Sequence, residues 1–335
     1  MDFDFQKPSK NQQIHLPLLE EKKVELFIKR EDLIHPFVSG NKFRKLKYNL
    51  RAAKEQQKAT LLTFGGAFSN HIVATAIAAQ LNGFKSIGII RGDELGHDLA
   101  KTLASNSTLR EAHRNGMLFK FISRESYREK SEKSFLNQLK ETYGNFYLIP
   151  EGGTNRLALK GCEEIVTKED SKFDYICCAI GTGGTISGLI NAAEIHQEIL
   201  GFPALKGIFL QDEIEKFTTK KNWQLTTSYH FGGYAKYNEV LISFINQFSK
   251  ENQIVLDPIY TGKMLFGILD LIYSLDGLTK YELAIFALTT RKFEELPSVK
   301  EEIKKKIKKP KPQVIYLSES ELKTLEKDNL SLFSK

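Results

Sequence analysis

Short apolar runs alternate with longer helical stretches between about residue 24 and residue 200 of the chain. The apolar runs predict strands at residues 24–28, 61–64, 86–90, 117–122, 146–149 and 175–180. Helical periodicity predicts helices at residues 41–57, 70–81, 98–114, 127–143 and 185–200, and another that ends at Glu164. Strands separated by helices of about ten or more residues need crossover connections, which make neighbouring strands parallel. We therefore expect an α/β fold with mostly parallel sheets.

Composition is that of an ordinary globular protein, with 335 residues, 41% hydrophobic and 27% charged. No apolar run approaches the ~20 residues that a helix needs to cross a bilayer. The N-terminal residues lack the basic start and apolar stretch of a secretory signal. Cys162, Cys177 and Cys178 favour reduced thiols over a disulfide framework or a zinc site, because two of them are adjacent in an apolar run. We expect a soluble, cytoplasmic protein with no membrane partner and no bound metal.

The formal net charge is +7, and the basic excess is diffuse except for a lysine cluster at residues 304–311. Such a cluster is compatible with a nucleic-acid or anionic-lipid surface. No aromatic residues interleave these lysines, as base stacking would require. A solvated helix end is therefore the better interpretation, and we expect no nucleic-acid partner.

A glycine-rich segment, Gly181-Thr-Gly-Gly-Thr185, follows the apolar strand at residues 175–180 and precedes a predicted helix. Backbone N–H groups and the helix dipole form an anion site at such a junction. The segment fails the dinucleotide fingerprint because residue 186 is Ile, and no lysine follows it as in a Walker loop. It is compatible with a cradle for a small phosphate group, or with a tight glycine turn.

A second strand-to-helix junction carries Phe64-Gly-Gly-Ala-Phe-Ser-Asn-His71. Ser69 or Asn70 alone would suffice to cap the following helix. Three consecutive polar side chains at a helix N-terminus, ending at His71, also suit a carboxylate ligand.

Lys42 lies in the segment Ser39-Gly-Asn-Lys-Phe-Arg-Lys-Leu46, at the predicted first turn of a helix. The helix dipole disfavours a cation there. Lys42 is either a surface lysine in a basic stretch or a lysine whose ammonium is destabilised, which makes it a usable amine nucleophile.

These three motifs and a fourth, Asp257-Pro-Ile-Tyr-Thr-Gly-Lys263, occur in a fixed order. Together they resemble the fold-type-II pyridoxal-phosphate enzymes, and within these the 1-aminocyclopropane-1-carboxylate deaminase and D-cysteine desulfhydrase family, over residues 14–275. The resemblance implies a tryptophan-synthase-β-like fold of two α/β domains with the cofactor between them. The expected large, cofactor-binding domain comprises residues 1–45 and 153–335, and the small domain residues 46–152. From about residue 291 onward the chain shows no resemblance.

The resemblance also implies a role for each matching residue. Lys42 is expected to carry pyridoxal 5′-phosphate as a Schiff base, and Asn70 to bind its 3′ oxygen. Gly181, Thr182, Gly183, Gly184 and Thr185 are expected to hold the phosphate. Ser69, Asn70 and His71 are expected to receive the carboxylate of a small amino-acid substrate. Lys42, Ser69, Tyr234 and Tyr260 are the expected catalytic residues, and a homodimer is the expected assembly.

Thr261 follows Tyr260 at a position where the deaminases carry Glu. A carboxylate at the pyridine nitrogen keeps the ring protonated and strongly electron-withdrawing, which opening a cyclopropane demands, whereas a hydroxyl leaves a weaker sink. The resemblance therefore favours a deaminating lyase that converts D-cysteine to pyruvate, sulfide and ammonia. Conversion of 1-aminocyclopropane-1-carboxylate to 2-oxobutanoate is the alternative.

One segment departs from the family. Its closing His-Thr-Gly-Gly loop is replaced here by Thr289-Thr-Arg291. Thr289 is expected to stand in for the family threonine near the pyridine nitrogen. The departure also leaves open a protein that binds the cofactor without turnover.

Overall fold

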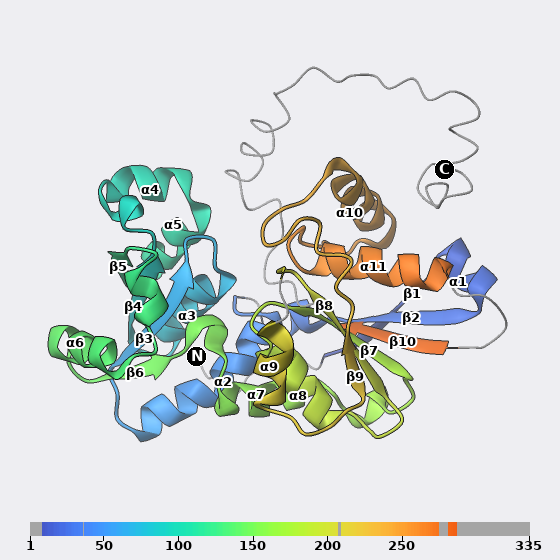
Figure 1. Cartoon of the computed structure of the whole chain (residues 1–335), viewed down its shortest axis with the longest axis horizontal. Helices are drawn as coiled ribbons and strands as arrows, with labels where there is room; N and C mark the ends of the chain where they lie inside the picture. Colours follow the sequence, from blue (N-terminus) through green and yellow to red (C-terminus); the bar gives the residue numbers. More distant parts are fainter. Residues whose placement is uncertain (1–8, 36, 207–208, 275–280, 287–335) are drawn as a thin grey trace, which may run out of the picture. The chain divides into compact units, whose positions relative to one another are not determined.

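The computed structural model describes residues 9–35, 37–206, 209–274 and 281–286, the last by their backbone alone. Its strands form two sheets (Figure 1). The six-stranded sheet has the order β1-β2-β10-β7-β8-β9, formed by β1 (Asn11–Ile14), β2 (Val24–Lys29), β7 (Tyr175–Ile180), β8 (Glu198–Pro203), β9 (Trp223–Leu225) and β10 (Tyr281–Phe286). The four-stranded sheet has the order β5-β4-β3-β6, formed by β3 (Thr60–Gly66), β4 (Lys85–Arg91), β5 (Met117–Ile122) and β6 (Phe146–Ile149). All neighbouring strands are parallel except β1 and β2, so the predicted α/β fold with parallel sheets is confirmed.

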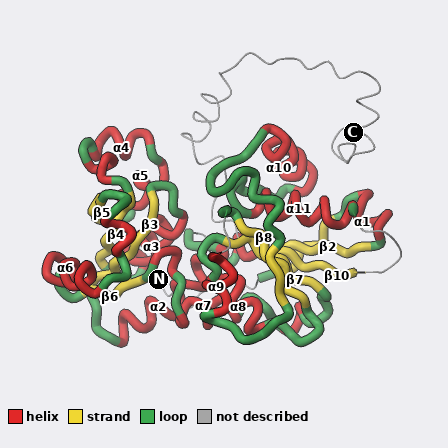
Figure 2. The backbone as a smooth tube through the Cα atoms, viewed as in Figure 1, coloured by secondary structure: helices red, strands yellow, loops and turns green. Residues whose placement is uncertain are grey.

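Helices connect the strands and cover the sheets (Figure 2). They are α1 (Pro17–Lys22), α2 (Gly40–Glu55), α3 (Asn70–Leu81), α4 (Leu99–Ser105), α5 (Ser107–Arg114), α6 (Lys133–Tyr143), α7 (Arg156–Glu163), α8 (Gly184–Ala192), α9 (Phe209–Glu215), α10 (Glu239–Asn252) and α11 (Thr261–Tyr273). Short 3₁₀ turns lie at Glu31–Leu33, Asp93–Gly96, Ser126–Glu129, Glu151–Gly153 and Lys168–Asp170. None of the helices in the described ranges is long and apolar enough to span a membrane.

Two predicted helices are wrong in their extent. The helix predicted at 98–114 is interrupted at Asn106, whose side chain accepts a hydrogen bond from the Leu109 N–H at 2.8 Å and thereby starts α5. The helix predicted at 185–200 ends at Ala192, because Ala193 adopts an extended backbone. The apolar residues after it form β8 beside β7. A short apolar run carries no periodicity that separates helix from strand.

A third helix is shorter than predicted, because the segment predicted at 127–143 contains the turn Ser126–Glu129 followed by α6. The strand predictions at 117–122, 146–149 and 175–180 are confirmed with their bounds. Strands β2, β3 and β4 extend slightly beyond the predicted runs.

Helix α2 contributes one side to the core beside the four-stranded sheet. Its residues Leu46, Leu50 and Ala53 pack with Leu61 of β3 and Ala78 of α3. Their three- and four-residue spacing is that of one helical face. The boundary predicted between residues 45 and 46 falls inside this continuous helix, and the division into two domains stays a prediction.

Glycines bring α2, α7 and α8 into close contact. A Cβ atom at Gly161 of α7 would lie 1.9 Å from the Arg44 carbonyl oxygen of α2. A Cβ atom at Gly188 of α8 would lie 2.5 Å from the Cys162 Cβ of α7. Only glycine permits such backbone approach. The three helices are therefore held at backbone contact, which fixes the start of α2 relative to α8.

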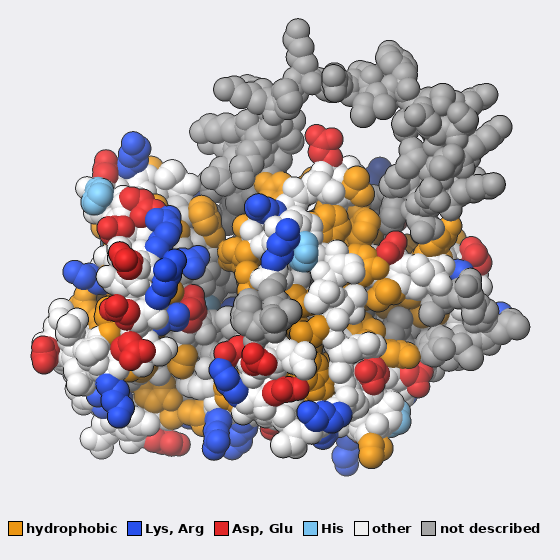
Figure 3. Space-filling view, in the orientation of Figure 1, with side chains coloured by type: hydrophobic (Ala, Val, Ile, Leu, Met, Phe, Trp, Pro, Cys, Tyr) orange, Lys and Arg blue, Asp and Glu red, His pale blue; other side chains and the backbone are white. Residues whose placement is uncertain are grey.

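Charged side chains of both signs are interspersed on the face shown in Figure 3.

The three cysteines are free and buried, and burial raises the pKa of Cys162 to about 11 and that of Cys178 to about 12.

Candidate active site

Lys42 lies in the first turn of α2, two residues after Gly40, whose φ of 62° favours glycine. Its side chain is partly accessible, and in the described ranges it has no hydrogen-bond or ion-pair partner. Loss of hydration around the ammonium, and then the charge of Lys45, lower the Lys42 pKa to about 7. Lys42 is therefore an amine without a partner in the described ranges, and about half of it is in the neutral, nucleophilic form near pH 7.

Lys45, one helical turn later, was not predicted as a site residue. It is only 2% exposed. Its Nζ donates to the Gly152 carbonyl at 3.0 Å, to Thr154 Oγ1 at 3.1 Å and to Thr182 Oγ1 at 3.5 Å. Desolvation lowers its pKa. Lys45 thus joins three segments and brings a cation to the glycine-rich loop, and no carboxylate among the described residues pairs with it.

The glycine-rich loop joins β7 to α8. Gly183 has a φ of 81° at the N-cap of α8. A Cβ atom at Gly184 would lie 2.8 Å from the Thr154 side chain and 3.2 Å from Lys45 Nζ. Thr185 is buried and accepts a hydrogen bond from Asn41 Nδ2 at 3.0 Å, so the start of α2 lies against the start of α8. The loop therefore offers backbone N–H groups, hydroxyls and a cation to an anion.

Ser69 and Asn70 lie at the N-terminus of α3, and both are partly exposed. Ser69 is the N-cap residue, yet its side chain makes no capping hydrogen bond. Among the described residues neither side chain has a hydrogen-bond partner. Helix capping therefore does not account for this pair, and both side chains remain available to a ligand.

His71 is 1% exposed and neutral, because burial and the nearby charges of Lys42 and Lys45 lower its pKa well below 6.5. The Thr63 hydroxyl donates its proton to the Ile149 carbonyl at 2.8 Å and contacts His71 Nε2 at 2.8 Å. Nε2 must therefore carry the imidazole proton. Nδ1 is left as a buried acceptor without a partner in the described structure. His71 then donates to a carboxylate only if it is protonated, which burial opposes.

The two predicted tyrosines face each other. The Tyr234 and Tyr260 ring centroids are 6.3 Å apart in an edge-to-face contact. Burial raises the pKa of both, and that of Tyr260 well above 10. Both therefore hold their protons at neutral pH. A Cβ atom at Gly181 would lie 3.4 Å from the Tyr260 ring, so this pair borders the glycine-rich loop.

Lys263 positions the loop that carries Tyr234, a role that was not predicted. Its Nζ donates to the carbonyls of His230 and Gly233, both at 2.9 Å. Loss of hydration lowers its pKa to about 8.

Asp257 organises the first turn of α11. Its carboxylate accepts from the N–H groups of Ile259, Tyr260 and Thr261. The Thr261 hydroxyl donates to Asp257 Oδ2 at 2.6 Å and accepts from the Asp257 N–H at 2.9 Å. Thr261 is 1% exposed. Since its proton is committed, Thr261 offers any further group a neutral oxygen lone pair.

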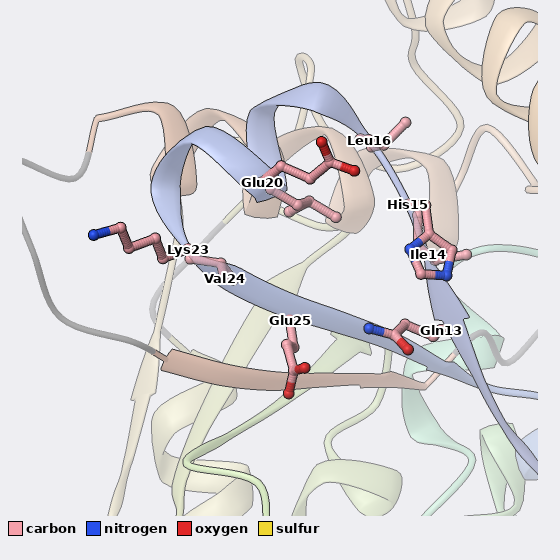
Figure 4. Close-up of a pocket in the computed structure, with 9 residues that line it drawn as sticks. Gln13, Ile14, His15, Leu16, Glu20, Lys23, Val24 and Glu25 are labelled. Atoms are coloured by element: carbon pink, nitrogen blue, oxygen red, sulfur yellow. The ribbon is translucent and has the colours of Figure 1, made fainter.

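The structure brings the four motifs close together: Lys45 contacts Thr182, Gly153 lies against both Lys45 and His71, and Gly181 lies against Tyr260. Thr289 lies outside the described residues, as does the segment from 291 onward. A separate pocket between β1, α1 and the start of β2 lies at the opposite, amino end of β2 (Figure 4). It is lined by Gln13, Ile14, His15, Leu16, Leu19, Glu20, Lys23, Val24 and Glu25. No predicted site residue lines it.

Comparison with protein-family models matches residues 8–279 to the family described as pyridoxal-phosphate dependent enzyme. The chain belongs to this family. It is 30% identical over 270 residues to the bifunctional D-cysteine desulfhydrase/1-aminocyclopropane-1-carboxylate deaminase of Arabidopsis thaliana, covering 73% of this chain and 67% of that protein. It is 28% identical over 272 residues to the D-cysteine desulfhydrase of Yersinia pestis, covering 73% and 80%. These relatives place it in the deaminase and desulfhydrase family that its motifs resemble.

A crystal structure of a deaminase homologue has a TM-score of 0.72 to this chain at 24% identity, covering 90% of this chain and 94% of that one. The predicted fold type II is thereby confirmed.

The residues present fit pyridoxal phosphate. Lys42 provides the unpaired amine, and its pKa of about 7 suits attack on an aldehyde. Gly183 and Gly184 leave space at the start of α8 that a side chain would fill. Lys45 has no carboxylate partner in the part of the chain that the structure describes, so its charge suits a phosphate.

Proposed function

We propose that the chain is a deaminating lyase that acts by β-elimination on a small D-amino acid, with conversion of D-cysteine to pyruvate, sulfide and ammonia as the expected reaction. The observation that supports it is Thr261, a neutral hydroxyl that donates to Asp257, at the position where a carboxylate distinguishes the deaminases. The homodimer and the cytoplasmic location expected from the family resemblance are part of this proposal.

Pyridoxal phosphate, when bound, supplies an electron sink for charge that develops at the substrate Cα. The glycine-rich loop and Lys45 are proposed to hold its phosphate. Ser69 and Asn70 are proposed to bind the substrate carboxylate, since their side chains have no other partner in the described structure.

Lys42 is the best base for the proton at Cα. About half of its amine is neutral near pH 7, whereas the hydroxyls of Tyr234 and Tyr260 keep their protons. The tyrosine pair is therefore proposed to donate hydrogen bonds at the substrate side chain and not to remove a proton.

Thiolate leaves from Cβ without a strongly electron-withdrawing ring, whereas carbon–carbon cleavage in a cyclopropane needs one. The lone pair of Thr261 provides a weaker partner for a protonated ring nitrogen than a carboxylate does. Elimination from D-cysteine is therefore proposed to be faster than ring opening.

The test is a substrate screen of the cofactor-loaded protein that measures sulfide and 2-oxo acid together. We expect sulfide and pyruvate from D-cysteine faster than 2-oxobutanoate from the cyclopropane. Thr261→Glu should lower sulfide release and raise ring opening, while Thr261→Ser, which keeps the hydroxyl, should change neither. Faster ring opening by the unmodified protein would contradict the proposed substrate, and absence of any turnover would favour a silent cofactor-binding protein.

A further inference from the structure

Arg91, the last residue of β4, lacks the carboxylate partners that Arg30 and Arg44 have in the described part of the fold. Within the described ranges no carboxylate lies within ion-pair distance of its guanidinium. Its side chain is exposed. By contrast, Arg30 and Arg44 are bound to Asp32 and Glu31.

The position of the Arg91 guanidinium is nevertheless defined. Its Cζ lies 5.8 Å from the centre of the Tyr127 ring, a cation–π contact. Tyr127 is 3% exposed, and its hydroxyl donates to Glu151 Oε1 at 2.9 Å. Glu151 in turn is 3.3 Å from Lys130, so its charge is already paired. A buried, tethered ring thus supports an unpaired cation.

Arg91 borders the proposed substrate site from two sides. It is the register partner of Gly66, and a Cβ atom at Gly66 would lie 3.7 Å from Arg91 Nη2. Gly66 begins the loop that ends at Ser69, and its carbonyl accepts the Ser69 N–H at 3.0 Å. The charge of Arg91 also lowers the pKa of Tyr234 against the effect of burial, which is consistent with Arg91 being near that tyrosine.

The roles proposed for Ser69, Lys42 and Tyr234 define how a substrate is oriented in the site. With its carboxylate at Ser69 and its amine toward Lys42, its side chain extends toward Tyr234, where Arg91 provides a planar, permanently charged group with several donors. This geometry matches a phosphate, sulfonate or carboxylate.

We propose that Arg91 selects substrates whose β-substituent carries an oxyanion. The inference rests on the proposed β-elimination and narrows its substrate class, so that an anionic leaving group is preferred to the neutral thiol of cysteine. With O-phospho-D-serine, Cα loses a proton to the base, and the Cβ–O bond breaks with its electron pair leaving on phosphate. The remaining aminoacrylate takes up one water to give pyruvate and ammonia.

The test compares O-phospho-D-serine with β-chloro-D-alanine, because both give pyruvate and only the first carries the oxyanion. In cofactor-loaded Arg91→Ala, the ratio of kcat/KM for the phosphate to that for the chloride is expected to fall about 10- to 100-fold, the loss typical of a charged hydrogen bond. Most of the change is expected in KM, and Arg91→Lys should lie between. The matched control is Arg124→Ala, which removes an arginine that follows β5, the strand next to β4, and is bound to Glu94 at 2.6 Å. The control should leave the ratio unchanged.

Binding separates this inference from the proposed reaction. D-2-amino-3-phosphonopropionate has no leaving group, and calorimetric titration gives its Kd without turnover. We expect Arg91→Ala to weaken its binding about 10- to 100-fold and D-alanine binding much less. Arg91-dependent binding without pyruvate from any substrate would uphold Arg91 and overturn the reaction. Turnover with an unchanged ratio in Arg91→Ala, or an equal loss on both substrates, would overturn Arg91.

Discussion

Two regions of this protein surround lysines and differ in whether a carboxylate balances the lysine charge. Lys29, 1% exposed, lies 2.6 Å from Asp170, which is fully buried. Asp170 also accepts from the Asn11 side chain and from the Thr167 N–H. Lys45, 2% exposed, is surrounded by carbonyl and hydroxyl oxygens, and no carboxylate pairs with it or with Lys42 in the described structure.

The difference shows what separates a structural lysine from a chemical one. Burial is common to both regions and does not by itself create reactivity. At Asp170 the fold provides the counter-charge, so the pair cross-links β1, β2 and the turn before β7. Around Lys42 the described residues provide no counter-charge, which destabilises the ammonium and favours binding of an anion. A missing partner is therefore the more informative sign of function.

The largest effect is expected from Lys42→Ala. The protein should lose the visible absorbance band of its bound cofactor and about 10³-fold or more of its activity, because the other described amine at the loop, that of Lys45, is held by three hydrogen bonds. Spectra and turnover of the variant measure this. A retained band, with borohydride labelling mapped to another lysine, would refute the assignment.

Removing one member of the structural pair should affect stability instead. Asp170→Asn leaves Lys29 buried and unpaired, and the free energy of unfolding should fall by about 3–5 kcal/mol. Denaturant unfolding measures it. The double variant Lys29→Met/Asp170→Leu should recover most of the loss, because it buries no charge. A single variant as stable as the parent would show that Asp170 does not compensate Lys29.

An added anion should stabilise the second region. Inorganic phosphate at about 100 times its Kd is expected to raise the unfolding free energy of the cofactor-free protein by about 2.7 kcal/mol. Lys45→Met removes the cation, and Gly183→Val places a β-branched side chain at a φ of 81°. Both variants should lose this gain, measured as a shift in Tm, whereas Lys29→Met should keep it. A phosphate shift that persists in both loop variants would place the anion elsewhere.

The smallest effect concerns pH. Lys42 must be neutral to react, and its pKa is lowered to about 7. The rate of cofactor loading should therefore rise with pH below about 7 and level off above it, followed by stopped-flow absorbance. Because the folded pKa lies below the unfolded value of about 10.4, the unfolded chain binds more protons between these values. Stability of the cofactor-free protein should then rise with pH across that window. Lys45→Met should move the inflection in loading upward, since the charge of Lys45 contributes to the lowered pKa.

Much of the fold was predictable because strand β7 and the helices around it carry clear apolar patterns. The extent of α8 was not, since the short apolar run of β8 (Glu198–Pro203) is compatible with helix or strand. The motifs also located Lys42 and the glycine-rich loop. Lys45 and Lys263 were missed because each binds backbone carbonyls of a distant loop. Every residue has such a carbonyl, so residue types do not indicate which ones a lysine binds. Asp257 acts on its neighbours' N–H groups in the same way.

The contact of Gly161 with Arg44 and of Gly188 with Cys162 has a further consequence. Helix α7 serves as a spacer of fixed thickness between the helix that bears the amine and the helix that begins at the phosphate cradle. Close contacts at the two glycines set this spacing, so side-chain rearrangement cannot change it. Any side chain added at either glycine would move α2 and α8 apart. The distance between the Lys42 amine and the glycine-rich loop is then independent of the substrate. Substitutions at residues proposed to border the substrate side chain, such as Arg91 or Tyr234, can change which substrate binds while the spacing that holds the cofactor stays the same.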